Sequence, residues 1–154
     1  MRELGIGLIG TGFMGRAHAL AFNNARAVFE LPFTLKLAAL ADADTERARR
    51  CATAWGFAQA HGDWQALIND PTVDVVAITT PNHLHYPMAM AAIAAGKAVY
   101  EPDLPHTARH DVAQLLRVTR VHALQECAER LAAGFARALV EVVHHVLGPA
   151  REHA

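Results

Sequence analysis

The sequence predicts an α/β fold in which a doubly wound parallel sheet carries helices on both faces, over roughly the first 100 of its 154 residues. Two observations predict it. Apolar runs alternate with helical patterns along this stretch, as they do in successive βα units. The apolar runs are also continuous, without the polar alternation of a half-exposed strand, which is typical of parallel strands that are covered by helices on both sides.

Cap and turn signals place the boundaries of the expected elements. Asp44 or Thr45 can cap the second helix, and Gly56 follows its last turn. Pro71 stops the third helix, and Gly96 closes the fourth. The expected order is strand 5–9, helix 16–29, strand 33–42, helix 44–56, strand 58–62, helix 63–71, strand 73–80, helix 85–96 and strand 98–100.

Composition and charge exclude several classes of protein. With 53% hydrophobic and 19% charged residues the chain is expected to be globular, and a net charge of −1 offers no basic patch for nucleic acid or a membrane surface. No apolar run reaches the ~18–20 residues of a membrane span. Glu3 and the early glycines interrupt any signal-peptide core, so we expect a cytoplasmic location.

A glycine loop follows the first expected strand and opens the first helix. It reads Gly10-Thr11-Gly12-Phe13-Met14-Gly15, which is the G-x-G-x-x-G pattern. The first glycine allows a tight turn, the second leaves room for a pyrophosphate, and the third lets the helix pack against the strand. Free N–H groups at the start of the helix would hold the phosphates. The loop therefore predicts a Rossmann-type dinucleotide site formed by these six residues.

An acidic residue ends the second expected strand, where a carboxylate can accept hydrogen bonds from the adenosine ribose. This residue is Asp42. Its charge would repel a 2′-phosphate, and no arginine stands at Ala43 to receive one, so NAD is favoured over NADP as the cofactor. The alternative interpretation makes Asp42 a solvated residue at the end of a strand and Asp44 merely a helix cap.

The stretch AITTPNHLHYPMAMAAIAAGKAVY, taken with the glycine loop, resembles the N-terminal domain of the glucose–fructose oxidoreductase / inositol dehydrogenase (Gfo/Idh/MocA) family. In that family a strand ends in a threonine-proline-asparagine run, with a histidine three residues later. The matching residues here are Thr80, Pro81, Asn82 and His85. The resemblance implies that they line the nicotinamide side of the cofactor together with Thr79. Another interpretation of His85 is a helix N-terminal residue bonded to the backbone.

The resemblance also implies hydride transfer with a sugar- or cyclitol-like substrate, but a signature residue is missing. The family's fifth strand leads into glutamate-lysine-proline, and its lysine assists proton transfer. Here the run is Glu101-Pro102-Asp103, in which Glu101 is the counterpart expected at the cofactor. An aspartate differs from a lysine in charge and proton affinity. Lys97 precedes the strand and is expected at its opposite end, so we assign no catalytic residue and expect incomplete catalysis.

The tail departs from the βα pattern, so we divide the chain into a dinucleotide-binding domain at 1–105 and an atypical tail at 106–154. The tail is expected to be mostly helical, although 138–146 would suit a strand nearly as well. By resemblance it is a remnant of the family's linker and the start of its substrate domain. Its apolar residues could join two copies of the chain into a homo-oligomer, through Phe135, Leu139, Val142 and Val146.

The ten histidines do not predict a metal site. His106 and His110 have the i, i+4 spacing that suits zinc on a helix, but Pro105 puts them at best at a helix start. Three functions remain open: an NAD-dependent oxidoreductase, a non-catalytic NAD(H)-binding sensor or regulatory module, and a truncated fragment without function. Saturable NADH binding separates the first two from the third, and turnover separates the first from the second.

Overall fold

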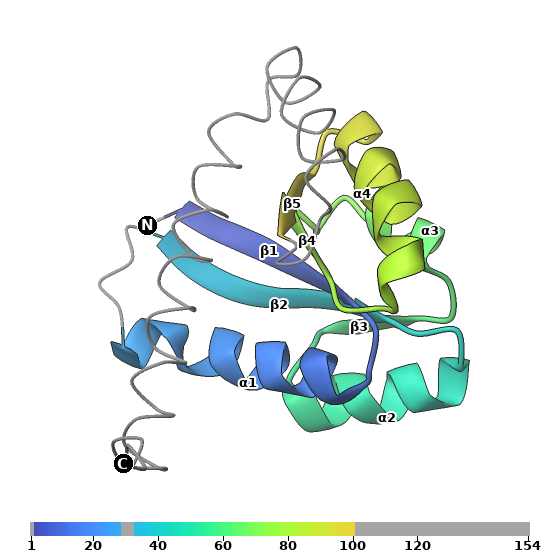
Figure 1. The fold of residues 1–154 in the computed structure, drawn as a ribbon. Coiled ribbons are helices and arrows are strands. Elements are labelled where there is room, and N and C mark those ends of the chain that lie inside the picture. Colours follow the sequence, from blue (N-terminus) through green and yellow to red (C-terminus); the bar gives the residue numbers. More distant parts are fainter. Residues whose placement is uncertain (1, 29–32, 101–154) are drawn as a thin grey trace, which may run out of the picture.

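A computed structural model describes residues 2–28 and 33–100 of the chain (Figure 1). Five parallel strands form one sheet in the order β3-β2-β1-β4-β5. The predicted Rossmann-type α/β fold is thereby confirmed. The elements are β1 (Arg2–Ile9), α1 (Phe13–Val28), β2 (Phe33–Ala41), α2 (Thr45–Trp55), β3 (Gln59–His61), α3 (Trp64–Asn69), β4 (Val75–Ile78), the 3₁₀ turn η1 (Asn82–Leu84), α4 (His85–Ala94) and β5 (Ala98–Tyr100).

The chain winds in two directions from the central strand β1. It goes first to β2 and β3 on one side of β1, and then crosses to β4 and β5 on the other side. Because crossover connections are right-handed, the two directions put their helices on opposite faces, α1 and α2 on one and α3 and α4 on the other (Figure 1). The direction reverses between β1 and β4, and ligands of such folds bind at this switch point, outside the carboxyl ends of the strands.

The core explains why the strands read as continuous apolar runs. Every side chain of β4 is buried, and so is β1 from Leu4 to Ile9. In β2 the second half, Ala38–Ala41, is buried, whereas the first half contains the exposed Lys36. Helix α2 buries two small residues, Ala48 and Ala52, whereas α3 buries the larger Leu67 and Ile68.

Hydrogen bonds account for the boundaries that differ from the sequence prediction. Strand β4 is shorter than 73–80 because Asp74 turns its carboxylate to the N–H of Gly5 (2.8 Å). At the other end of β4, Thr79 donates its hydroxyl to the carbonyl of Ile9 (2.8 Å). Helix α1 begins inside the glycine loop, at Phe13 rather than at residue 16.

The predicted caps of α2 are confirmed. Asp44 is the N-cap and accepts a hydrogen bond from the N–H of Arg47 (3.0 Å), so the alternative cap Thr45 is already helical. Gly56 ends the helix in the left-handed conformation (φ 86°), which suits glycine. In the described ranges, no helix combines the length and the apolar character that crossing a membrane requires.

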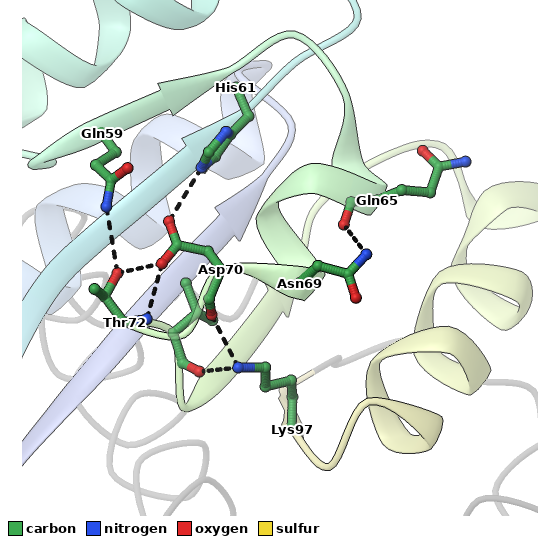
Figure 2. Close-up of polar contacts among 8 residues, drawn as sticks. Gln59, His61, Gln65, Asn69, Asp70, Thr72 and Lys97 are labelled. Atoms are coloured by element: carbon green, nitrogen blue, oxygen red, sulfur yellow. Dashed lines mark hydrogen bonds and ion pairs between the residues drawn. The ribbon is translucent and has the colours of Figure 1, made fainter.

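A buried carboxylate joins β3, α3 and the start of β4 (Figure 2). Asp70 is only 7% exposed and accepts hydrogen bonds from the N–H (2.8 Å) and the hydroxyl (2.6 Å) of Thr72. His61 Nε2 lies 3.2 Å from its other oxygen. Lys97 donates to the backbone carbonyls of Asp70 (2.9 Å) and Val73 (2.7 Å). Lys97 is therefore held beside the start of β4, away from the carboxyl end of the sheet, as predicted.

We expect Asp70→Ala to lower the free energy of unfolding by about 3 kcal/mol at pH 7, since it removes the buried acceptor of three hydrogen bonds that contribute about 1 kcal/mol each. Burial alone would raise the pKa of Asp70, but hydrogen bonds from Thr72 and His61 lower it below its ordinary value. The ionised group thus stabilises the fold above the unfolded-state pKa of about 3.9, and this contribution is lost as the pH falls further. Urea unfolding at pH 7 and pH 3 measures both effects.

The difference in the free energy of unfolding between wild type and Asp70→Ala should therefore be smaller at pH 3 than at pH 7. The matched control is Asp63→Ala, which removes an exposed N-cap carboxylate from α3 and should cost about 1 kcal/mol. Equal stability of Asp70→Ala and wild type at pH 7 would contradict the structural role assigned to Asp70.

Candidate functional site

The glycine loop lies at the carboxyl end of β1 and leads directly into α1. Gly10 has φ 105°, a backbone conformation that residues with a side chain rarely adopt. Its N–H donates a hydrogen bond to the carbonyl of Ala41 (2.8 Å). A Cβ atom added at Gly12 would meet no heavy atom within 4 Å, so open space lies beside this residue. At Gly15 the same atom would overlap with the carbonyl of Gly10. The loop thus exposes Gly12 and packs Gly15 against its own backbone.

Asp42 follows β2 and faces the glycine loop. Its carboxylate accepts hydrogen bonds from the N–H of Thr11 (3.1 Å) and from the Thr11 hydroxyl. The other oxygen accepts from the N–H of Asp44 (3.0 Å) and from Arg47 Nη2 (2.6 Å). Burial by itself would raise the pKa of Asp42, but the hydrogen bonds from Arg47, Thr11 and Asp44 and the charge of Arg47 lower it. Asp42 is therefore ionised at neutral pH.

The segment after β4 forms the opposite wall. The N–H of Thr79 donates to the carbonyl of Ile9 (2.9 Å), which ties this segment to the end of β1. Thr80 lies next, with its hydroxyl 3.6 Å from the sulfur of Met88. His85 is 4% exposed, and its Nε2–H donates to the carbonyl of Thr80 (2.5 Å). The turn between β4 and α4 is therefore fixed from inside by a buried histidine.

These segments enclose a cavity of about 520 Å³ at the switch point between β1 and β4. This volume lies within the ~300–1,000 Å³ that is usual for small-molecule sites. The lining residues are Ile9, Gly10, Thr11, Gly12, Ala41, Asp42, Ala43, Arg47, Gly62, Asp63, Trp64, Thr79, Thr80, Pro81, Leu84 and Met88.

Seven of the thirteen sequence-predicted site residues line this cavity. They are Gly10, Thr11, Gly12, Asp42, Thr79, Thr80 and Pro81. Gly15 is buried beneath the loop, and Phe13 (85% exposed), Met14 and Asn82 are exposed outside the lining. His85 has the backbone-bonded position that was its alternative interpretation. Glu101 lies outside the described residues, as do the tail residues 106–154 with the proposed oligomer contact.

Sequence reasoning missed several lining residues, among them Arg47, Asp63 and Trp64. Arg47 is in the first turn of α2, five residues after Asp42 rather than at the adjacent position 43. Asp63 and Trp64 follow β3, and parallel strands bring the segments after them to one edge of the sheet. Trp64 packs against the core and also lines the cavity.

The residues present fit a dinucleotide. The start of α1, where backbone N–H groups lack helical partners, faces the space beside Gly12, and such helix starts bind phosphates. Asp42 supplies an ionised acceptor for hydroxyl groups in the same cavity. In the described part of the chain, the ionisable side chains of the lining are those of Asp42, Arg47 and Asp63.

Comparison with known proteins agrees with this arrangement. The model of a family described as "Oxidoreductase family, NAD-binding Rossmann fold" matches residues 4–102. Levoglucosan dehydrogenase of Pseudarthrobacter phenanthrenivorans is 43% identical over 100 residues, which are 64% of this chain and 26% of that protein. Inositol 2-dehydrogenase 1 of Saccharopolyspora erythraea is 33% identical over 134 residues, 86% of this chain and 36% of its own. The chain thus spans about a quarter to a third of these relatives.

Solved structures show the same similarity. An NAD binding oxidoreductase from Klebsiella pneumoniae has a TM-score of 0.69 and 53% identity, covering 76% of this chain and 32% of its own. Levoglucosan dehydrogenase in complex with NADH and levoglucosan has a TM-score of 0.62 and 42% identity, and the match covers 64% of this chain and 27% of that chain. Biliverdin reductase from Synechocystis, in complex with biliverdin and NADP+, has a TM-score of 0.58 and 31% identity, and the match covers 74% of this chain and 34% of that chain.

Proposed function

This chain belongs to the Gfo/Idh/MocA oxidoreductase family with the NAD-binding Rossmann fold, and on that premise we propose that its cavity holds NAD(H). One observation carries the proposal: the open space beside Gly12 and the ionised Asp42 belong to the same cavity at the switch point of the sheet. The loop and the start of α1 would hold the pyrophosphate, and Asp42 would hold the adenosine ribose.

We propose that the segment Thr79–Pro81 holds the nicotinamide half of the cofactor. This segment follows β4 and Asp42 follows β2, and the two strands lie on opposite sides of β1, which supports the assignment. His85 would act by fixing the Thr80 carbonyl through its hydrogen bond, rather than by touching the cofactor. When bound, the nicotinamide supplies or accepts a hydride. We propose a sugar- or cyclitol-like substrate for this hydride transfer, and the levoglucosan and inositol dehydrogenases among the relatives support it.

We propose NAD as the preferred cofactor because Asp42 is an acceptor for ribose hydroxyls and repels a 2′-phosphate. Two further observations support cofactor binding without complete catalysis. The run Glu101-Pro102-Asp103 lacks the family's lysine, and the described cavity lining contains neither lysine nor histidine for proton transfer. A non-catalytic NAD(H)-binding module is therefore the second candidate function, and turnover distinguishes the two.

We expect NADH to bind saturably and Asp42→Ala to weaken this binding by about 10- to 100-fold. The reason is the loss of charge-assisted hydrogen bonds of about 1.5–3 kcal/mol to the ribose. Titration of the full chain with NADH, following energy transfer from tryptophan to the nicotinamide, measures the affinity. Trp64 lines the cavity and should give most of this signal, so Trp64→Phe should remove more of it than Trp55→Phe.

Glu46→Ala is the matched control, because this exposed carboxylate lies on α2 and pairs with Arg49 instead of facing the cavity. It should leave NADH affinity unchanged. A folded chain that does not bind NADH would contradict both candidate functions. For a chain that binds NADH, oxidation of levoglucosan or inositol with NAD would favour the enzyme, and binding without turnover would favour the module.

A further inference from the structure

Every acceptor position of the Asp42 carboxylate is already used within the protein. A carboxylate has about four lone-pair sites. One oxygen receives the N–H and the hydroxyl of Thr11, and the other receives the N–H of Asp44 and Nη2 of Arg47. The ribose hydroxyls of a bound dinucleotide would have to donate to the same oxygens. Binding at Asp42 therefore requires at least one of the present donors to leave.

Of the two donors to Asp42 Oδ1, the Arg47 side chain can leave more easily than the N–H of Asp44. The N–H groups of Thr11 and Asp44 belong to the backbone, and Asp44 is fixed as the N-cap of α2. The Arg47 side chain is 51% exposed, whereas that of Asp42 is 8% exposed. The guanidinium can therefore turn away from a fixed carboxylate and remain in contact with water. Arg47 competes with the ribose for this oxygen of Asp42.

Arg47 is also the single cation among the described residues that line the cavity. The lining contains two anions, Asp42 and Asp63, so the formal charge of this wall is −1 with Arg47 and −2 without it. The other two arginines of α2, Arg49 and Arg50, are not in the lining, and Arg49 pairs with Glu46 (2.9 Å). A 2′-phosphate next to Asp42 would thus depend on Arg47 for its counter-charge, and a guanidinium binds phosphate well.

From this arrangement we infer that Arg47 determines the selectivity between NAD and NADP. In this inference, which rests on the proposed cofactor site, Arg47 leaves Asp42 when a dinucleotide binds and becomes the ligand of the 2′-phosphate when that dinucleotide is NADP. Asp42 alone would exclude the phosphorylated cofactor. Asp42 and Arg47 together give a site that prefers NAD and still accepts NADP.

Titration of the full-length wild type, Arg47→Ala, Arg47→Lys and Arg49→Ala with NADH and NADPH tests the inference. Arg47→Ala should weaken NADPH binding at least tenfold, while NADH binding stays within about threefold of wild type or becomes tighter. Arg47→Lys should retain part of the NADPH affinity, because it keeps the charge without the planar fork. Arg49→Ala should leave both affinities unchanged. Circular dichroism verifies that each variant is folded.

The remaining outcomes each decide the matter. Wild type that binds NADH but shows no measurable NADPH binding would overturn the inference and leave the proposed function intact. The inference would also be overturned if Arg47→Ala weakened the binding of NADH and NADPH equally, or weakened the binding of neither. Wild type that binds neither cofactor would contradict the proposed function itself, and the inference with it.

Discussion

Replacing Gly12 by valine is expected to weaken NADH binding at least 100-fold while the protein stays folded. A Cβ atom at Gly12 would meet no heavy atom within 4 Å beyond the adjoining residues, so the new side chain points into open space. It would instead fill the space where the pyrophosphate approaches the start of α1. Two lost charge-assisted hydrogen bonds of about 1.5–3 kcal/mol each account for the expected loss.

Tryptophan-to-NADH energy transfer measures this affinity, and thermal unfolding of the unliganded protein measures stability. The free energy of unfolding should change by less than about 1 kcal/mol, since Gly12 is exposed and its substitution removes no packing. Unchanged NADH affinity in a folded Gly12→Val protein would place the cofactor elsewhere. A large loss of stability would show that the loop does not have the open geometry described above.

Replacing Gly15 by alanine is expected to destabilise the fold by about 3 kcal/mol or more. The added Cβ would overlap with the backbone carbonyl of Gly10 and come within 3.2 Å of the Thr79 hydroxyl oxygen. Gly15 lies in α1, where helix propensity alone predicts a gain of about 1 kcal/mol for alanine over glycine. Overpacking typically costs about 1–3 kcal/mol and occasionally more. Because the obstacle here is backbone, which no rotamer change can move, we expect a cost of about 4 kcal/mol, which leaves a net loss of about 3 kcal/mol after the propensity gain.

The sign of the change is therefore the test for Gly15→Ala. For a domain of this size, 3 kcal/mol corresponds to a fall in Tm of about 12–24 °C. Gly12→Ala is the matched control, because it places the same methyl group in the same loop without a clash. An increase in Tm for Gly15→Ala would mean that the helix-propensity gain dominates and that α1 does not pack as closely on Gly10 as the structure shows.

The two glycines also separate two kinds of failure. Loss of binding with intact folding in Gly12→Val would point to the cofactor, and loss of folding in Gly15→Ala would point to helix packing. The G-x-G-x-x-G pattern predicts these two roles. The open space beside Gly12 and the close approach of Gly15 to Gly10 and Thr79 support them in this chain.

Much of the fold was predictable because its signals are local. Continuous apolar runs predicted buried parallel strands, and cap residues such as Asp44 and Gly56 predicted the limits of α2. The shortening of β4 was not predictable in this way, because the hydrogen bonds at its ends run across the sheet, from Thr79 to Ile9 and between Asp74 and Gly5. The 3₁₀ turn before α4 is formed by a local hydrogen bond, from the N–H of Leu84 to the carbonyl of Pro81.

The amino-acid sequence alone indicates which chemical groups are available: a glycine loop after a first strand, an acid after the second, and the absence of lysine at positions 101–103. Which of these side chains meet depends on how the strands assemble into the sheet. Arg47 and Trp64 come to the cavity because β2 and β3 end at the same edge of the sheet as β1 and β4. Strand order is a long-range property set by packing of the whole sheet, so no local pattern encodes it. The hydrogen bond from the N–H of Thr11 to Asp42 follows from that order, because β1 and β2 are neighbours in the sheet.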